Sequence, residues 1–240
     1  MGDEVLLDLD DAGIATVTLN RPDKLNIFNL AMRDALIEAV TAVRDLPDAR
    51  VMILRANGRH FSAGADLSEF GSAPHHLEAR RIRWDRDPWG PLWDLPQPTI
   101  AALHGHAVGS GLEMALLCDL RFASADTSLG LPETKLGMLP AAGGTQSLTR
   151  AVGPASALPV VLGGASMDAE RARLLGIVHE VVDDVEASAR QAANRLALCD
   201  RGVLSAARRA LHAAGDLALD AGLALEKRLE STTRNRPHRA

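Results

Sequence analysis

Thr99-Ile-Ala-Ala-Leu103 is an apolar run that predicts a buried strand, and Leu112-Glu-Met-Ala-Leu-Leu-Cys118 predicts a helix. Between them lies His104-Gly-His-Ala-Val-Gly-Ser-Gly111, in which Gly109 and Gly111 flank Ser110. Glycine tolerates positive φ and lets a ligand approach the backbone closely. The first N–H groups of a helix have no intrahelical partner, and together with the helix dipole they favour negative charge. This strand-to-helix turn is therefore predicted to bind an anionic or polarised oxygen.

Two carboxyl groups near this turn, Glu113 and Glu133, lie in mostly uncharged stretches of sequence, where a charge is costly. Glu113 follows Ser110 by three residues, so its side chain and the Ser110 N–H can share one face of the helix. An anion-stabilising donor beside a carboxylate suits proton transfer at a carbon next to a carbonyl.

Phe61-Ser-Ala-Gly-Ala-Asp-Leu67 repeats the pattern of a strand, a glycine turn and a helix-like start. The N–H of Ala65, after the flexible Gly64, is a candidate second donor, and two donors from two turns can hold one carbonyl oxygen. The alternative, that Ala63-Gly64-Ala65 is only a tight turn, stays open at this point.

The rest of the chain alternates strands with helices and ends in helices. Residues 5–9 and 14–19 predict a hairpin around Asp10-Asp-Ala-Gly13, 30–45 predicts a helix capped by Asn29, and 51–54 predicts a buried strand. Residues 168–175 predict a helix that stops at Gly176, and 177–182 a strand. We expect an α/β fold with a core over residues 1–185 and a helical region over 186–240.

Composition excludes several classes of protein. The chain has 240 residues, 47% hydrophobic and 24% charged, with a formal net charge of −5, which does not favour binding to nucleic acid or to an anionic membrane. No apolar run approaches the ~20 residues of a membrane span. Of the two cysteines, Cys118 is predicted to be a buried thiol. The start Met1-Gly-Asp-Glu lacks the basic residues of a signal peptide, so we expect a cytoplasmic protein.

Three other motifs fit less well. Gly109-Ser-Gly-Leu-Glu-Met114 lacks the third glycine of a dinucleotide-binding fingerprint. Ser110 lacks the glycines two positions to either side that a nucleophile elbow requires. His104 and His106 alternate onto one face and could hold a metal, but without a suitable third ligand, packing or hydrogen bonding is favoured and no metal site is predicted.

Two segments carry charged and aromatic residues. Residues 71–94 hold several arginines and all three tryptophans, and either a packed helix and loop or the wall of an apolar pocket fits this composition. Residues 232–240 are polar and basic and predict a frayed tail.

Taken together, the motifs resemble those of the enoyl-CoA hydratase/isomerase (crotonase) family over about residues 5–230, in both order and spacing. The matching pieces are Arg21-Pro-Asp-Lys-Leu-Asn26, Phe61 to Leu67, Gly105 to Glu113, Cys118-Asp119, Leu131-Pro-Glu133, Leu136-Gly137, Gly143-Gly-Thr-Gln146 and Leu175-Gly-Ile-Val178. The resemblance implies a spiral of repeated β-β-α turns and a C-terminal helical region that forms a homotrimer or a dimer of trimers. It also implies an acyl-CoA thioester as substrate and no separate cofactor.

The resemblance further assigns roles to residues. The oxyanion donors map onto the N–H groups of Ala65 and Ser110, although Ser110 stands where the family usually has glycine. Glu113 and Glu133 map onto the acid/base pair of the hydratase branch, so the resemblance favours addition of water to a 2-enoyl-CoA. A double-bond isomerase, or a weakly active acyl-CoA-binding trimer, is the alternative. The positions mapped to substrate binding are Lys24, Leu25, Ala63, Gly64, Asp66, Leu67 and Gly109.

Overall fold

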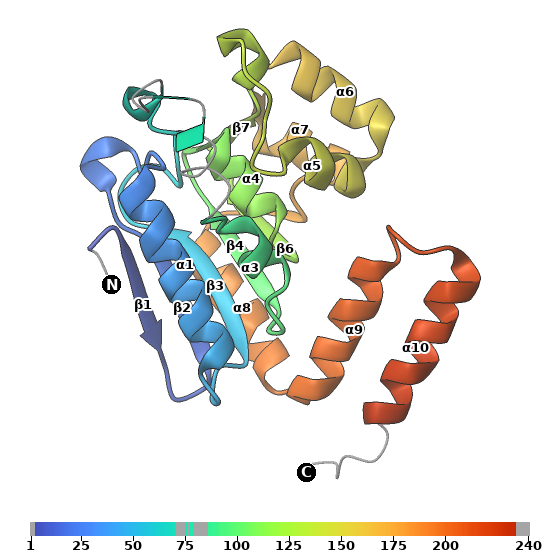
Figure 1. The fold of residues 1–240 in the computed structure, drawn as a ribbon. Helices are drawn as coiled ribbons and strands as arrows, with labels where there is room; N and C mark the ends of the chain where they lie inside the picture. Colours follow the sequence, from blue (N-terminus) through green and yellow to red (C-terminus); the bar gives the residue numbers. More distant parts are fainter. Residues whose placement is uncertain (1–2, 71–74, 76, 79–85, 234–240) are drawn as a thin grey trace.

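The computed structural model describes residues 3–70, 75, 77–78 and 86–233, and its centre is a six-stranded sheet (Figure 1). The strand order is β1 (Val5–Leu9), β2 (Ile14–Leu19), β3 (Val51–Ala56), β4 (Thr99–Leu103), β6 (Leu120–Ser124) and β9 (Glu180–Val182). All neighbouring pairs are parallel except β1 with β2, which form the predicted hairpin. A smaller sheet has the order β5 (His106–Val108), β7 (Ser128–Gly130) and β8 (Met167–Asp168).

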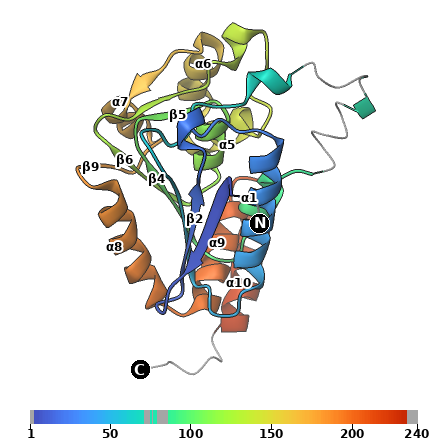
Figure 2. The same cartoon turned by 90° about the vertical axis from the view of Figure 1, so that its left-hand side faces the viewer.

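Helices cover both faces of the large sheet, as Figure 2 shows for α1 and α8. The helices of the described residues are α1 (Leu30–Asp45), α3 (Trp89–Trp93), α4 (Ser110–Leu116), α5 (Gly144–Val152), α6 (Pro154–Gly163), α7 (Ala169–Leu175), α8 (Val185–Ala197), α9 (Arg201–Ala213) and α10 (Leu219–Thr233). The Asn29 side chain accepts the N–H of Met32 and caps α1, as the sequence predicted.

The two faces of the large sheet bury different side chains because successive residues of a strand point to opposite sides. In β3, Met52 and Leu54 join the main core with α1, while Val51 and Ile53 join a second core with α8. Small residues of α8, among them Ala189 and Ala193, let this helix lie close against the strands. Burial on both faces explains why β3 is apolar from Val51 to Leu54 and β4 from Ile100 to Leu103 rather than alternating.

The chain winds as a spiral in which a strand of the large sheet leads to a strand of the small sheet and then to a helix. β4 leads to β5 and α4, and β6 leads to β7 and the 3₁₀ turn η3 (Glu133–Leu136). β4 pairs in parallel with β6, and β5 pairs in parallel with β7. Equivalent positions of these successive turns of the spiral therefore lie side by side. The predicted β-β-α spiral is therefore present.

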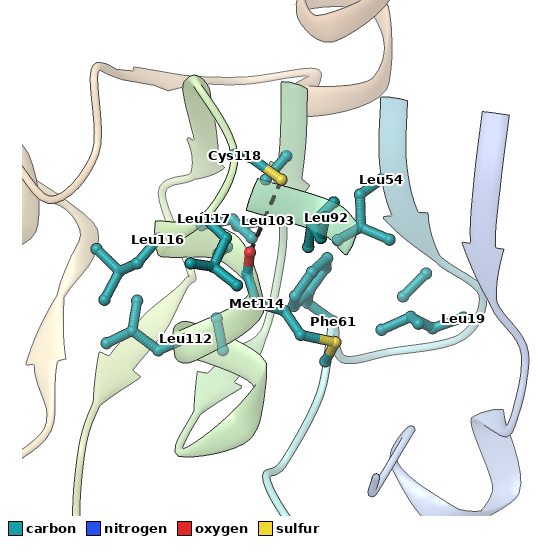
Figure 3. Close-up of a cluster of buried hydrophobic side chains, with 14 of the residues drawn as sticks. Leu19, Leu54, Phe61, Leu92, Leu103, Leu112, Met114, Leu116, Leu117 and Cys118 are labelled. Atoms are coloured by element: carbon teal, nitrogen blue, oxygen red, sulfur yellow. Dashed lines mark hydrogen bonds between the residues drawn. The ribbon is translucent and has the colours of Figure 1, made fainter. Parts of the chain in front are cut away.

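Behind the turn at Ser110 lies the most deeply buried helix. Every residue of α4 is buried, and Leu112, Met114 and Leu116 pack in the cluster that includes Phe61 (Figure 3). Cys118 lies in the same cluster, its Sγ 3.8 Å from the Met114 carbonyl oxygen, and burial raises the pKa of its thiol to about 12. Cys118 is thus a buried free thiol, as predicted.

The last two helices form an antiparallel pair that projects from the rest of the molecule (Figure 1). Helix α9 is anchored by the buried Arg208, whose Nε donates to both carboxylate oxygens of Asp119 at 2.9 and 2.7 Å. Helix α10 has no buried residue among the described residues 219–233.

Some expectations need correction or lie outside the described residues. The strand predicted over 177–182 begins only at Glu180, because the N–H groups of Ile177 and Val178 donate to the carbonyl oxygen of Ala172 in α7. The helix-like start at Leu67 is a single 3₁₀ turn, η2 (Leu67–Glu69).

Trp89 and Trp93 lie in α3. The frayed tail predicted over 232–240 begins too early, because Thr232 and Thr233 are the last residues of α10. Residues 1–2, 71–74, 76, 79–85 and 234–240 lie outside the described part of the chain. No helix among the described residues is both long and apolar enough to cross a lipid bilayer. The division of the chain at residues 185 and 186 stays a prediction.

Candidate active site

The register of the small sheet brings two distant turns together. Ser62 forms a parallel bridge with Ala107 of β5, and three residues further along each segment stand Ala65 and Ser110. Because parallel neighbours run in the same direction, the segments that follow this bridge leave the sheet side by side. The two predicted N–H donors therefore come from neighbouring turns of the spiral.

Glycine makes the close approach of these two turns possible. Gly64 has φ +101° and Gly109 has φ +54°, conformations that side-chain-bearing residues rarely adopt. A Cβ on Gly109 would lie 3.6 Å from the Cα of Gly64, and a Cβ on Gly64 would lie 3.2 Å from the Val108 carbonyl oxygen. The two backbones thus pack directly against each other, with no side chain between them.

The N–H groups that follow these glycines make no backbone hydrogen bond within the described residues. Around Ala65, the backbone bonds run from Phe28 N–H to Gly64 and from Asp66 N–H to Phe28, which leaves the Ala65 N–H without an acceptor among the described residues. Ser110 is the first residue of α4, where an N–H has no intrahelical partner, and among the described residues it too has no acceptor. Both groups can therefore donate to a bound oxygen.

Glu113 is buried in the first turn of α4 and is held by another loop. Its Oε1 accepts the N–H groups of Ala142 and Gly144, each at 2.9 Å, and its side chain is almost fully buried. Two backbone donors stabilise the ionised form of a buried carboxyl group and fix its orientation. These amide donors were not predicted from the sequence, in which Gly143-Gly144 stood out as part of a motif shared with the family.

Glu133 lies beside the same turn but in a different environment. β7 pairs with β5, and Gly109 donates its N–H to the Gly130 carbonyl oxygen at 2.9 Å, which places Glu133 next to Gly109. A Cβ on Gly109 would lie only 2.9 Å from Glu133 Oε1. Burial raises the pKa of Glu133, and its buried Oε2 has no hydrogen-bond partner among the described residues.

The loop predicted to bind CoA lies against the first of the two turns. Leu25 accepts the Ala63 N–H at 3.0 Å, and Leu25 itself has φ +53° and is 45% exposed. Lys24 precedes it in the 3₁₀ turn η1 (Pro22–Lys24). The exposed residues Lys24 and Leu25 thus lie against the turn of Ala63 and Gly64 that precedes Ala65, and within this turn Gly64 is buried.

Asp66 and Leu67 follow on the same side. The Ser68 hydroxyl, 2.6 Å from Asp66 Oδ1, lowers the pKa of Asp66, and the charges of Arg21 and Lys24 act in the same direction. Leu67 is 52% exposed, so an apolar side chain is available to a ligand at this edge. The assignment of these residues to substrate binding stays a prediction.

The histidines next to this region have structural contacts. His104 Nε2 lies 3.1 Å from the Gly58 carbonyl oxygen, and the ring of His106 stacks on His60 with 4.3 Å between centroids. Among the described residues, no group of three or more His, Cys, Asp or Glu side chains could hold a metal ion.

Comparison with known proteins identifies the family. The family model described as enoyl-CoA hydratase/isomerase matches residues 10–240. The chain belongs to the enoyl-CoA hydratase/isomerase family. Among curated members, a probable enoyl-CoA hydratase of Mycobacterium tuberculosis is 37% identical over 94% of this chain and 88% of its own length. The 2,3-dehydroadipyl-CoA hydratase of Escherichia coli K12 is 38% identical over 90% of this chain and 85% of its own length.

Solved structures of family members share the fold. The enoyl-CoA hydratase of Bacillus anthracis matches with a TM-score of 0.92 and 32% identity, over 98% of this chain and 93% of its own. An enoyl-CoA hydratase subunit from Geobacillus kaustophilus matches with a TM-score of 0.91 and 34% identity, over 97% of this chain and 90% of its own. The spiral with its C-terminal helices is therefore the fold of this family.

Proposed function

We propose that this protein adds water across the 2,3 double bond of a 2-enoyl-CoA and releases a 3-hydroxyacyl-CoA. The observation that supports the proposal is that the turns of Ala65 and Ser110, whose N–H groups have no acceptor among the described residues, pack against each other at Gly64 and Gly109, with the Glu133 carboxyl beside Gly109 and the Glu113 carboxyl held in the first turn of α4. Two titratable groups whose environments shift their pKa values apart are typical of an acid and a base that act together.

In the proposed reaction the thioester carbonyl oxygen accepts the N–H groups of Ala65 and Ser110. Addition of water to C3 moves electrons onto this oxygen, and the two donors stabilise the charge that develops there. A helix dipole at the start of α4 acts in the same direction. Hydrogen bonds of this kind are worth about 3 kcal/mol each in comparable enzymes.

The two glutamates then divide the proton transfers. Glu113, held by two backbone amides, takes a proton from water as the water oxygen bonds to C3. Glu133, whose raised pKa favours the protonated form, gives its proton to C2. Atoms balance, because C2 gains a hydrogen and C3 a hydroxyl group, and a proton must pass from Glu113 to Glu133, directly or through solvent, before the next cycle.

The test is loss of the enoyl absorbance of crotonyl-CoA and of longer 2-enoyl-CoAs. We expect Glu113→Gln and Glu133→Gln each to lower kcat by roughly 10² to 10⁴-fold while CoA binding persists. Glu170→Gln is the matched control, because Glu170 is an exposed acid paired with Arg173 on α7. Full activity in either glutamate variant removes that residue from the mechanism, and migration of the double bond without hydration identifies an isomerase instead.

We also propose a homotrimer or a dimer of trimers in which the C-terminal helices contact neighbouring subunits. The support is the projecting pair of α9 and α10, whose leucines are exposed, including Leu211 at 74% and Leu219 at 79%. Light scattering after size-exclusion chromatography should give three or six times the 25.5 kDa of one chain. A separate cofactor is not part of the proposed chemistry, and a cytoplasmic location stays a prediction.

A further inference from the structure

Ser62 is a fully buried polar residue between the two turns of the site, and the proposed chemistry makes no use of its side chain. Its main chain is fixed to β5, since its N–H donates to the His106 carbonyl oxygen at 2.8 Å and its carbonyl oxygen accepts the Val108 N–H at 3.0 Å. This pairing leaves the hydroxyl group free to act on the segments around it.

The main chain of Ser62 is held by β5, but its hydroxyl contacts two other segments. Ser62 Oγ donates to the Asn26 carbonyl oxygen at 2.8 Å and accepts the Gly64 N–H at 3.3 Å. It therefore connects the loop of Lys24 and Leu25 to the turn that presents the Ala65 N–H. A buried hydroxyl with both a donor and an acceptor role satisfied restrains its partners strongly.

The loop on the far side of this contact is itself rigid. Asn26 is fully buried at φ +51°; its Oδ1 accepts the Arg21 N–H at 2.7 Å, and its Nδ2 donates to the carbonyl oxygens of Asn57 and His60 at 2.8 Å each. Through its bond to the Asn26 carbonyl oxygen, Ser62 thus ties the Ala63–Gly64 peptide to a rigid loop.

Ser62 also touches the second turn. A Cβ on Gly111 would lie 2.8 Å from both the Cβ and the carbonyl oxygen of Ser62, so the first turn of α4 packs directly on this residue. One side chain is therefore in contact with the segments that carry both proposed donors.

We propose that Ser62 is a positioning residue. Its hydroxyl holds the Ala63–Gly64 peptide through the Gly64 N–H, and the Phe28 N–H holds the Gly64 carbonyl oxygen at 2.8 Å, so that the backbone at Gly64 is set with the Ala65 N–H facing the thioester oxygen. This inference rests on the proposed role of Ala65. Gly64 has the freedom to rotate, and without the Ser62 hydroxyl its N–H has no side-chain acceptor within the described residues. When a donor is displaced by a fraction of an ångström, it loses more of its stabilisation of the transition state than of its contribution to substrate binding.

The kinetic test is Ser62→Ala with a 2-enoyl-CoA substrate. We expect kcat to fall about 10- to 100-fold. KM should change less than about threefold, because the Leu25–Ala63 bond and the Asn26 side chain still hold the CoA loop. Thr127→Val is the matched control, since it removes another buried hydroxyl, which donates to the Leu103 carbonyl oxygen at 3.2 Å, and should lower stability without lowering kcat.

A second variant, Ser62→Cys, keeps the proposal testable if Ser62→Ala does not fold. Ser62→Cys keeps a weak donor and acceptor, so we expect kcat between those of Ser62→Ala and the wild type. If Ser62→Ala does not fold, a wild-type kcat in Ser62→Cys overturns the proposal, and so does a wild-type kcat in a folded Ser62→Ala.

A readout that needs no turnover separates this inference from the proposed function. The infrared carbonyl stretch of butyryl-CoA labelled with ¹³C at the thioester carbon should shift to lower frequency on binding, and the shift should be smaller in Ser62→Ala at equal saturation. An equal shift in both proteins overturns the positioning role even if the wild type hydrates enoyl-CoA. A reduced shift in Ser62→Ala supports it even if the wild type does not hydrate.

Discussion

The two glutamates of this site have the same side chain but different surroundings. Glu113 and Glu133 are both glutamates near Gly109, yet the first is held by two amide donors while burial raises the pKa of the second. An ionised Glu133 has a buried oxygen without a partner among the described residues, so its charged form costs stability. Stability and function therefore oppose each other at this residue.

This opposition predicts a pH-dependent gain in stability for Glu133→Gln. A carboxyl group whose pKa is raised by folding binds its proton more tightly in the folded state, so the cost of ionising it is present at high pH and disappears as the pH falls below the ordinary value of 4.5. We expect the variant to be more stable than the wild type by on the order of 1 kcal/mol near pH 8. The two should converge near about pH 4, and urea unfolding at both pH values measures the difference.

Gly144 gives a second prediction at the same scale. A Cβ there would lie 2.7 Å from Glu113 Oε1 and 3.0 Å from Pro140 Cβ, so Gly144→Ala must displace the carboxylate. We expect kcat to fall by about 10²-fold with KM little changed. Gly222→Ala in α10 is the control, because its Cβ meets nothing within 4 Å and alanine favours a helix by about 1 kcal/mol. Equal activity of both variants would show that Glu113 does not need its present position.

At the scale of elements, α9 is attached by charge rather than by an apolar face. Asp119 accepts Arg208 and lies 3.0 Å from His212 Nε2, and it also accepts the Thr99 N–H at 2.8 Å. Burial by itself raises the pKa of Asp119, but the bond from His212 and the charge of Arg208 outweigh it, so the pKa lies below the usual value. The His212 ring also stacks on Trp93, with 4.0 Å between centroids.

Arg208→Met should therefore loosen the C-terminal helices. Removing one partner of a largely buried ion pair leaves the other uncompensated, and we expect a loss of about 3 kcal/mol at neutral pH. Because folding lowers the pKa of Asp119, its contribution is present above the ordinary value of 3.8 and is lost as the pH falls through the folded pKa, so the deficit should shrink in acid. Arg173→Met, which removes an exposed pair with Glu170, should cost less than about 1 kcal/mol.

At the scale of the whole molecule, the exposed leucines of the C-terminal pair need a partner surface if they are to be buried. Leu219 is 79% and Leu223 is 49% exposed, and within the described chain α10 contributes no residue to a buried core. Exposed apolar residues gathered in one region often mark an assembly surface.

The proposed assembly predicts that Leu219→Glu with Leu223→Glu lowers the molar mass in solution toward that of one chain. Charges placed in an apolar contact are costly to desolvate, so subunits should separate. Light scattering measures the mass, and circular dichroism checks that the helices remain. Leu162→Glu, at a 70% exposed position in α6, is the matched control for adding charge to an exposed leucine. An unchanged mass in the double variant would show that these leucines do not hold subunits together.

Local sequence was enough to predict most elements of this protein and the turns on which its site depends. The cap at Asn29, the hairpin at Asp10 to Gly13 and the glycines before Ala65 and Ser110 could be predicted because capping, turns and positive φ are properties of a few adjacent residues. The spiral itself was reached through resemblance to a family, because the pairing of strands is not a local property.

Only the tertiary structure decided which of these groups meet and what holds them. The amides of Ala142 and Gly144 reach Glu113 across about 30 positions of sequence, Arg208 reaches Asp119 across 89, and Ser62 connects Asn26 to Gly64. Such contacts depend on strand register and on the packing of whole elements, which no short stretch of residues specifies. The physical reason is that a buried polar group is satisfied by whichever partner the fold brings to it, whatever the separation along the chain.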